Sequence, residues 1–207
     1  MKTVGRILKY TALTLIFSII AFLLVRILIA EYYPAAMKEL TPTETLRAAY
    51  EANPNLEMRR QKLAISYDNA EFALFMADHQ YYCPEAGELQ IALRYNESTL
   101  AEVKADFGLS EEPAPSPELF DFTLYDDNGN RYPLALQISG HKYMYHYYKL
   151  GFTGVDFSEK TNWIRVDIYY KDAINYDEEP YACILLYNKE LAKDDTVYTL
   201  REGDLAR

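Results

Sequence analysis

The chain has 207 residues and a formal net charge of −10, with only three histidines and two cysteines among its potential metal ligands and nucleophiles. Residues 31–207 hold 17 of the 21 basic residues and all 31 acidic residues, a net charge of −14. This acidic excess argues against nucleic acid as a partner, because phosphate binding requires clustered lysine and arginine. About 175 residues suffice for one domain with its own core.

The first segment of the chain is strongly apolar. Residues 7–30 carry only Lys9 and Arg26 as charges, and as a helix they would span ~36 Å, more than the ~30 Å hydrocarbon core of a bilayer. Lys2 and Arg6 come before this segment, and no acidic residue lies among the first thirty. Because cationic flanks stay in the cytoplasm, we predict a cytoplasmic stub at 1–6, a single transmembrane helix at 7–30 and an extracytoplasmic remainder.

A cleaved signal peptide is the alternative interpretation of this segment. Its apolar core is usually about 7–15 residues long and is followed by a small-residue cleavage site. Here sixteen uncharged residues run from Tyr10 to Val25, and the triplets at 28–30 and 34–36 match a cleavage site poorly. An uncleaved signal-anchor in the cell membrane is therefore favoured.

Residues 31–56 are predicted to form a stalk helix or linker. Thr41-Pro42-Thr43-Glu44 combines a capping box with proline near the helix start, and Asn53-Pro54-Asn55 ends the helical pattern. The stalk would separate the membrane from a domain at 57–207.

Within residues 57–207 the hydrophobic pattern has the period of β-strands. We predict strands near 63–67, 71–76, 89–95, 120–125, 131–138, 142–152, 163–170 and 181–188. A second capping box at Thr99 and Glu102 predicts a helix ending at Gly108. Because strands and helices do not alternate regularly, this pattern indicates a mainly-β, immunoglobulin-like two-sheet sandwich with one or two short helices.

One hairpin is well marked in the sequence. Asp127-Asn128-Gly129 supplies the positive φ that a tight turn between 119–126 and 131–138 requires. Pro133 cannot donate to a β-ladder, so the return strand should lie at a sheet edge.

Several distinctive motifs lie between 79 and 187: His79-Gln80-Tyr81-Tyr82-Cys83-Pro84-Glu85, Gly87-Glu88-Leu89-Gln90-Ile91, Arg94-Tyr95-Asn96, Tyr143-Met144-Tyr145-His146-Tyr147, Phe152-x-Gly154-Val155-Asp156 and Glu179-Pro180-Tyr181. Together they resemble the motifs of a group of uncharacterised membrane-anchored proteins of Gram-positive bacteria. The resemblance covers roughly half of the chain and implies an extracytoplasmic β-sandwich behind an N-terminal anchor. It implies no activity and no site residues.

Metal sites are weakly indicated. A zinc site needs three or four converging ligands, and the close pairs here are His79 with Cys83 and His141 with His146. His141 and His146 are five residues apart, so on one strand their side chains would point to opposite faces. Asp126, Asn128 and Asn130 match the first three ligands of a calcium loop, but Arg131 and Gln137 occupy its sixth and twelfth positions. We therefore predict no metal and no cofactor.

Cys83 and Cys183 both lie on the predicted outside, where a disulfide can form. A bridge between them and two buried thiols are equally compatible with the sequence. The chain lacks the G-x-S-x-G, H-E-x-x-H, P-loop and dinucleotide fingerprints, so we do not expect an enzyme; an envelope hydrolase is a distant alternative.

Aromatic residues mark the candidate binding surface. Tyr143, Tyr145 and Tyr147 would share one face of a strand, while Trp163 and Tyr169 lie opposite the apolar face of theirs. Either such rings are exposed and bind a protein or a glycan, or a helix covers them and makes a second small core. We predict an extracytoplasmic interaction module that binds an envelope protein, with a carbohydrate-binding module as the alternative.

Overall fold

The computed structural model describes residues 2–30, 34–62, 75–96, 101, 105, 120–157, 161–171, 180, 182–187 and 196–206. The chain divides into two compact units, Met1–Pro34 and Ala35–Arg207. The predicted strand at 63–67, most of the helix at 99–108 and the first part of the strand at 71–76 lie outside the described residues.

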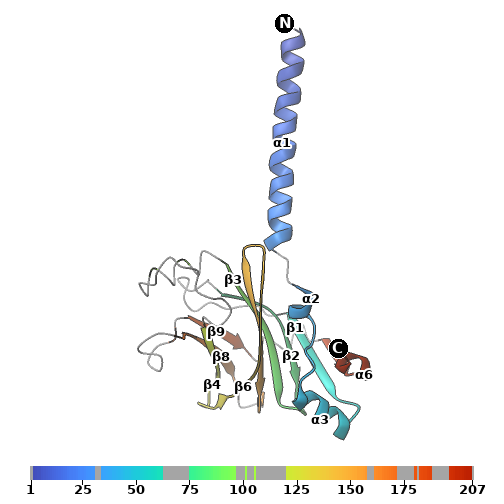
Figure 1. Cartoon of the computed structure of the whole chain (residues 1–207), viewed down its shortest axis with the longest axis vertical. Coiled ribbons are helices and arrows are strands. Elements are labelled where there is room, and N and C mark those ends of the chain that lie inside the picture. The colour runs from blue at the N-terminus through green and yellow to red at the C-terminus, as the bar shows by residue number, and fades with distance from the viewer. Residues whose placement is uncertain are drawn as a thin grey trace. The chain divides into compact units, whose positions relative to one another are not determined.

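The first unit contains the helix α1, Lys2–Ala30 (Figure 1). Its segment Lys9–Ile29 has 21 residues with a mean hydropathy of 2.7 and is not buried within the protein. A helix that is apolar on all sides and this long matches the thickness of a bilayer core. The prediction of an N-terminal helix long and apolar enough to span a membrane is therefore confirmed.

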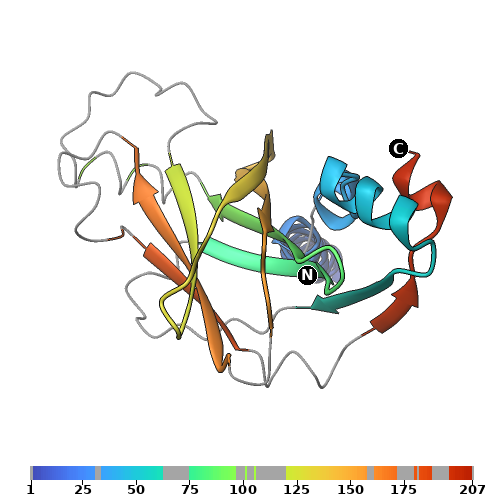
Figure 2. The same cartoon turned by 90° about the horizontal axis from the view of Figure 1, so that it is seen from below.

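The second unit contains two antiparallel sheets (Figures 1 and 2). The six-stranded sheet has the order β10-β1-β2-β3-β7-β6, with β10 Thr196–Thr199, β1 Glu57–Lys62, β2 Phe75–Cys83, β3 Glu88–Asn96, β7 Tyr145–Thr153 and β6 Leu134–Lys142. The four-stranded sheet has the order β5-β4-β8-β9, with β5 Arg131–Tyr132, β4 Phe120–Asp126, β8 Trp163–Tyr170 and β9 Ala182–Tyr187. The mainly-β, two-sheet class is confirmed; its immunoglobulin-like detail stays a prediction.

The main core lies between the two sheets. Alternate residues of the strands face inward and form one buried cluster, as the two-residue period of a strand requires. The cluster includes Leu89, Ile91 and Leu93 of β3, Phe120, Phe122 and Leu124 of β4, Leu150 and Phe152 of β7, and Ile164, Val166 and Ile168 of β8.

The hairpin at 127–129 forms as predicted. Gly129 adopts φ 81°, and Leu124 and Tyr125 pair with Tyr132 and Arg131. The predicted return strand is divided at Pro133: β5 ends the four-stranded sheet and β6 ends the six-stranded sheet. Both pieces lie at sheet edges, so the expectation drawn from Pro133 is confirmed.

The predicted strand at 142–152 is interrupted at its start. Lys142 pairs with Tyr145, so that residues 143 and 144 form the two-residue turn between β6 and β7. Tyr143 adopts φ 58°, which is uncommon for a residue other than glycine. This turn has none of the usual Asn-Gly or Asp-Gly sequences, and for that reason the sequence pattern did not reveal it.

The outer face of the six-stranded sheet carries a second core. Helices α3 (Glu44–Ala52) and α6 (Glu202–Leu205) lie on the side of this sheet away from the four-stranded sheet (Figure 2). Their buried residues join strand residues in one cluster of Leu46, Leu56, Met58, Tyr81, Cys83, Leu200 and Leu205. Of the stalk predicted at 31–56, residues 35–56 therefore belong to the same compact unit as the sheets, because an amphipathic helix buries its apolar face where a sheet is available.

Candidate functional site

The outer face of the six-stranded sheet also buries polar and charged side chains. Glu88, Gln90 and Arg94 of β3 and Lys149 of β7 are all inaccessible or nearly so. Residues 88–95 are consequently buried on both faces of β3, where the sequence pattern predicted one face in water. Glu88, Gln90 and Lys149 are covered by the segment 35–43, here called the connector, which comprises helix α2 (Ala35–Lys38) and the residues leading to α3.

Gln90 and Glu88 hold the distal end of the connector. The Thr41 N–H donates to Gln90 Oε1 at 2.9 Å, and Gln90 Nε2 donates to the Thr41 carbonyl at 2.7 Å. The Thr43 hydroxyl donates to Glu88 Oε2 at 2.6 Å, and Gln90 Nε2 also donates to Glu88 Oε1 at 2.8 Å. Burial raises the pKa of Glu88, while the hydrogen bonds from Thr43 and Gln90 act in the opposite direction.

Lys149 holds the proximal end of the connector. Its Nζ donates to the carbonyls of Glu39 at 2.8 Å and Met37 at 3.3 Å, and it lies 4.8 Å from the centre of the Tyr81 ring. Burial, with a further contribution from the charge of Arg60, lowers the pKa of Lys149 to about 8. The ammonium thus satisfies carbonyls at the C-terminal end of α2, where a cation is favourable.

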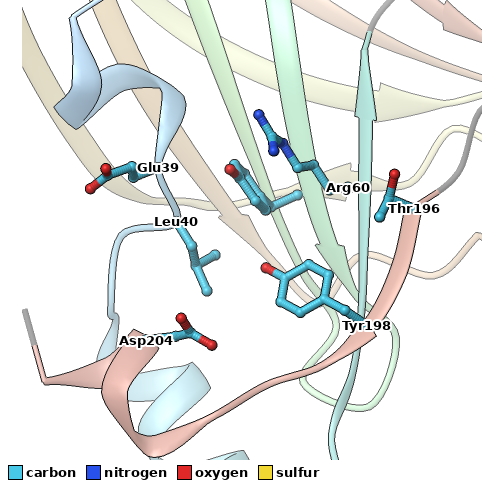
Figure 3. Close-up of a pocket in the computed structure, with 7 residues that line it drawn as sticks. Glu39, Leu40, Arg60, Thr196, Tyr198 and Asp204 are labelled. Atoms are coloured by element: carbon cyan, nitrogen blue, oxygen red, sulfur yellow. The ribbon is translucent and has the colours of Figure 1, made fainter.

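A cleft of about 310 Å³ opens beside the connector. Its walls come from the connector, three neighbouring strands and the C-terminal helix, and it is lined by Glu39, Leu40, Arg60, Tyr81, Thr196, Tyr198 and Asp204. Figure 3 shows Tyr198 between Arg60 and Asp204, with its hydroxyl directed toward Leu40. The volume is at the lower end of the range of small-ligand and side-chain pockets.

The chemistry of the cleft suits binding. Burial, together with the nearby Tyr81 and Asp204, raises the pKa of Tyr198 to about 12, so its hydroxyl remains a hydrogen-bond donor at neutral pH. The Asp204 carboxylate accepts the Arg201 N–H at 3.0 Å and supplies a negative charge at one end, while Arg60 supplies a positive charge at the other. Among the described residues, no group of three or more His, Cys, Asp or Glu could hold a metal ion.

The predicted row of tyrosines on the β6–β7 hairpin is not an exposed surface. Tyr143 lies in the turn and is 53% exposed, Tyr145 is half-buried beneath the Arg94 guanidinium at 4.5 Å, and Tyr147 is 0% exposed. The three rings were placed on one face because 142–152 was treated as one strand, and that face was expected to be either an exposed binding surface or covered by a helix. The turn and the connector together remove that surface.

Trp163 and Tyr169 do share one face. Both are half-buried on the outward face of the four-stranded sheet, where the Arg165 guanidinium lies 5.9 Å from the Trp163 ring. Arg165 forms an ion pair with the buried Asp167 at 2.6 Å. Tyr125 stands opposite Arg165 on β4 and adds a third ring to this face. These residues form a second candidate surface.

His141 and His146 were expected to face opposite ways, and this was wrong. The turn at 143–144 places them directly opposite each other, with ring centres 4.6 Å apart. The Tyr95 ring stacks on His146 at 4.9 Å. The side chain of His79 lies outside the described residues. A pair of histidines alone falls short of the three or four ligands of a zinc site.

The two cysteines are not joined by a disulfide. Cys83 is buried in the second core, and burial raises the pKa of its thiol, which disfavours the nucleophilic thiolate. Cys183 lies on β9 in the other sheet. The oxygen atoms of Asp126, considered above as a calcium ligand, accept hydrogen bonds from the turn that it begins.

The cleft was not foreseen from the sequence. Its lining residues come from positions 39–40, 60, 81, 196–198 and 204, and no local pattern relates these segments. The one usable signal was the alternation of Thr196 and Tyr198 on a short strand. Comparisons of the chain with protein-family models, curated proteins and solved structures found no match.

Proposed function

We propose that this protein is a membrane-tethered extracytoplasmic interaction module that binds a protein partner in the cleft. The N-terminal helix would be the tether, and Lys2, Arg6 and Lys9 support a cytoplasmic N-terminus. The domain then acts outside the membrane, as the resemblance to anchored Gram-positive proteins also implies.

The observation that carries this proposal is the composition of the cleft. Two tyrosine residues, an arginine and two acidic residues line it from separate elements. Tyrosine and arginine are enriched where proteins bind one another, because each combines a large contact area with hydrogen-bonding groups. The connector supports this function because it supplies Glu39 and Leu40 to the cleft while its backbone is fixed by Gln90 and Lys149.

Site-specific photo-crosslinking tests the proposal. We expect a benzophenone amino acid at Thr196, on the cleft, to form protein adducts in intact cells that produce the full chain. The matched control is the same amino acid at Ala135, an exposed position on β6 at the opposite edge of the same sheet. Equal adducts at both positions, or none at Thr196, would contradict the proposal.

A glycan-binding function has its own support in the face that carries Trp163, Tyr125 and Tyr169. Half-buried rings beside Arg165 offer the stacking surfaces and polar groups that a sugar requires. We expect Trp163→Ala to abolish binding on a glycan array while changing the free energy of unfolding by less than about 1 kcal/mol, because the ring is half-buried on an outer face.

The control for this substitution is Tyr143→Ala, which removes an exposed ring at the tip of the β6–β7 hairpin. Glycan binding that survives Trp163→Ala, or a large loss of stability in that variant, would remove the second candidate function.

A further inference from the structure

Among the described strands, β10 lies at the edge of the six-stranded sheet, next to the cleft. Within the described part of the chain, β1 is its one strand partner. The Leu200 N–H donates to the Leu56 carbonyl at 2.9 Å, and Tyr198 pairs with Met58 in register. In an antiparallel pair, residues that bond to the partner alternate with residues whose backbone groups point away. The N–H and C=O groups of Val197 and Thr199 therefore point outward.

The side chains of β10 alternate in the same way. Thr196 and Tyr198 line the cleft, whereas Val197 is 53% exposed and faces away from it. An extended segment that paired with Val197 and Thr199 would place every second side chain over the cleft, because strands repeat every two residues.

The charges beside β10 define which side chain fits. Asp204 lies at the Tyr198 end of the cleft, and Arg60 pairs with Thr196, one repeat or ~7 Å farther along the strand. A cationic side chain next to Tyr198 would meet a carboxylate and the face of an aromatic ring. The net charge of −14 over residues 31–207 also attracts a basic segment.

We propose that a basic, extended peptide segment of the partner adds to the open edge of β10 and inserts a lysine or arginine side chain into the cleft between Tyr198 and Asp204. This inference rests on the proposed protein-binding function and specifies its ligand. Backbone pairing with Val197 and Thr199 supplies affinity, and the cleft supplies selectivity for the basic side chain.

The first experiment tests backbone pairing. The probe is an acetylated and amidated octapeptide that alternates threonine and lysine, and its binding to the full chain in non-ionic detergent is measured by fluorescence anisotropy. Val197→Pro removes an outward N–H and leaves the bonds to β1 in place, because proline is tolerated at an edge strand. We expect at least about tenfold weaker binding for Val197→Pro and unchanged binding for Val197→Ala, which keeps the N–H.

The second experiment tests the charge selectivity. Asp204→Asn should weaken binding of the lysine peptide about threefold, whereas Glu202→Gln, with the same change in net charge on an exposed residue of α6, should not. Arg60→Gln should leave binding equal or tighter, because it removes a like charge. A peptide that alternates threonine and glutamate should not bind, and a peptide that alternates proline and lysine should bind at least about tenfold more weakly than the threonine–lysine peptide.

The results separate this inference from the proposed function. Equal binding of the lysine peptide to Val197→Pro and to the unmodified protein, with near-UV circular dichroism unchanged, would overturn strand addition. Tight binding of the proline–lysine or glutamate peptide would do the same. If crosslinking from Thr196 persists while the peptides fail, the protein-binding function stands and this inference falls. If neither crosslinking from Thr196 nor peptide binding is observed, both the protein-binding function and this inference are wrong.

Discussion

Replacing Gln90 with leucine is expected to lower the free energy of unfolding by about 3 kcal/mol. The leucine keeps the approximate volume of Gln90 but leaves the partly buried N–H and carbonyl of Thr41 without their partner on β3. Each unsatisfied buried group costs ~1–3 kcal/mol, and Glu88 also loses the amide that donates to it. Denaturant unfolding of the full chain in detergent, followed by tryptophan fluorescence, measures the change.

The same variant should release the connector. Without the bonds to Thr41, the backbone near Lys38 becomes a better trypsin site, because proteolysis requires local unfolding. The matched control is Gln137→Leu, an exposed glutamine on β6 of the same sheet, which should change stability by less than ~0.5 kcal/mol. Equal stability of the two variants, or an unchanged rate of cleavage near Lys38, would show that Gln90 does not hold the connector.

The connector follows helix α1 in the chain and contributes to the candidate site. Its backbone binds Gln90 and Lys149, and its residues Glu39 and Leu40 form one wall of the cleft. The segment that follows helix α1 is therefore a structural part of the proposed binding site. Because the backbone of this wall is already held by hydrogen bonds, less of the site must become ordered when a ligand binds, and less entropy is lost.

Local patterns in the sequence predicted much of the fold. The alternation of Leu89, Ile91 and Leu93 with Gln90 and Ala92 correctly indicated a strand, because side-chain period is a property of the backbone itself. It did not indicate that the polar face would be covered. That outcome depends on residues 35–43, about fifty positions earlier in the chain, and such tertiary contacts leave no periodic signal.

The candidate site was less accessible to prediction for the same reason. Trp163 and Tyr169 were correctly placed on one face, since β8 is one regular strand. Tyr147 was a candidate binding residue, with a covering helix as the alternative, and its ring is buried. The sequence could not decide between the two, because alternation gives the face of a strand and not what lies over it. The turn at Tyr143 lacks glycine and asparagine, so its left-handed backbone had no sequence marker.

Replacing Asp126 with alanine is expected to lower the free energy of unfolding by about 3 kcal/mol at neutral pH. Asp126 is buried, with 3% of its surface exposed. Its Oδ1 accepts the N–H groups of Asn128 at 2.9 Å and Asn130 at 2.8 Å. Its Oδ2 accepts the Asn130 amide and the Tyr132 hydroxyl, both at 2.8 Å. Alanine leaves these donors unpaired in the turn that joins β4 to β5, and charge-assisted bonds are the costliest to lose.

The loss should depend on pH. Burial alone would raise the pKa of Asp126, but the hydrogen bonds from Asn130, Tyr132 and the backbone N–H groups outweigh it, so the pKa lies below 3.8. A carboxylate whose pKa is depressed by folding contributes stability above its unfolded pKa, and that contribution disappears as the pH falls through the folded value. The difference in the free energy of unfolding between the unmodified protein and Asp126→Ala should therefore have its full value at pH 7 and be smaller at pH 3.

Denaturant unfolding of both proteins at the two pH values measures this difference. Burial raises the pKa of Glu88, and that group is unchanged in both proteins, so its titration cancels in the comparison. Asp126→Asn is the matched control: it keeps the shape and one acceptor oxygen, so we expect a smaller loss than for Asp126→Ala. The difference in unfolding free energy between these two variants should be the same at pH 7 and pH 3, because neither replacement side chain titrates. A loss for Asp126→Ala that is equal at both pH values would show that the charge of Asp126 does not stabilise the turn.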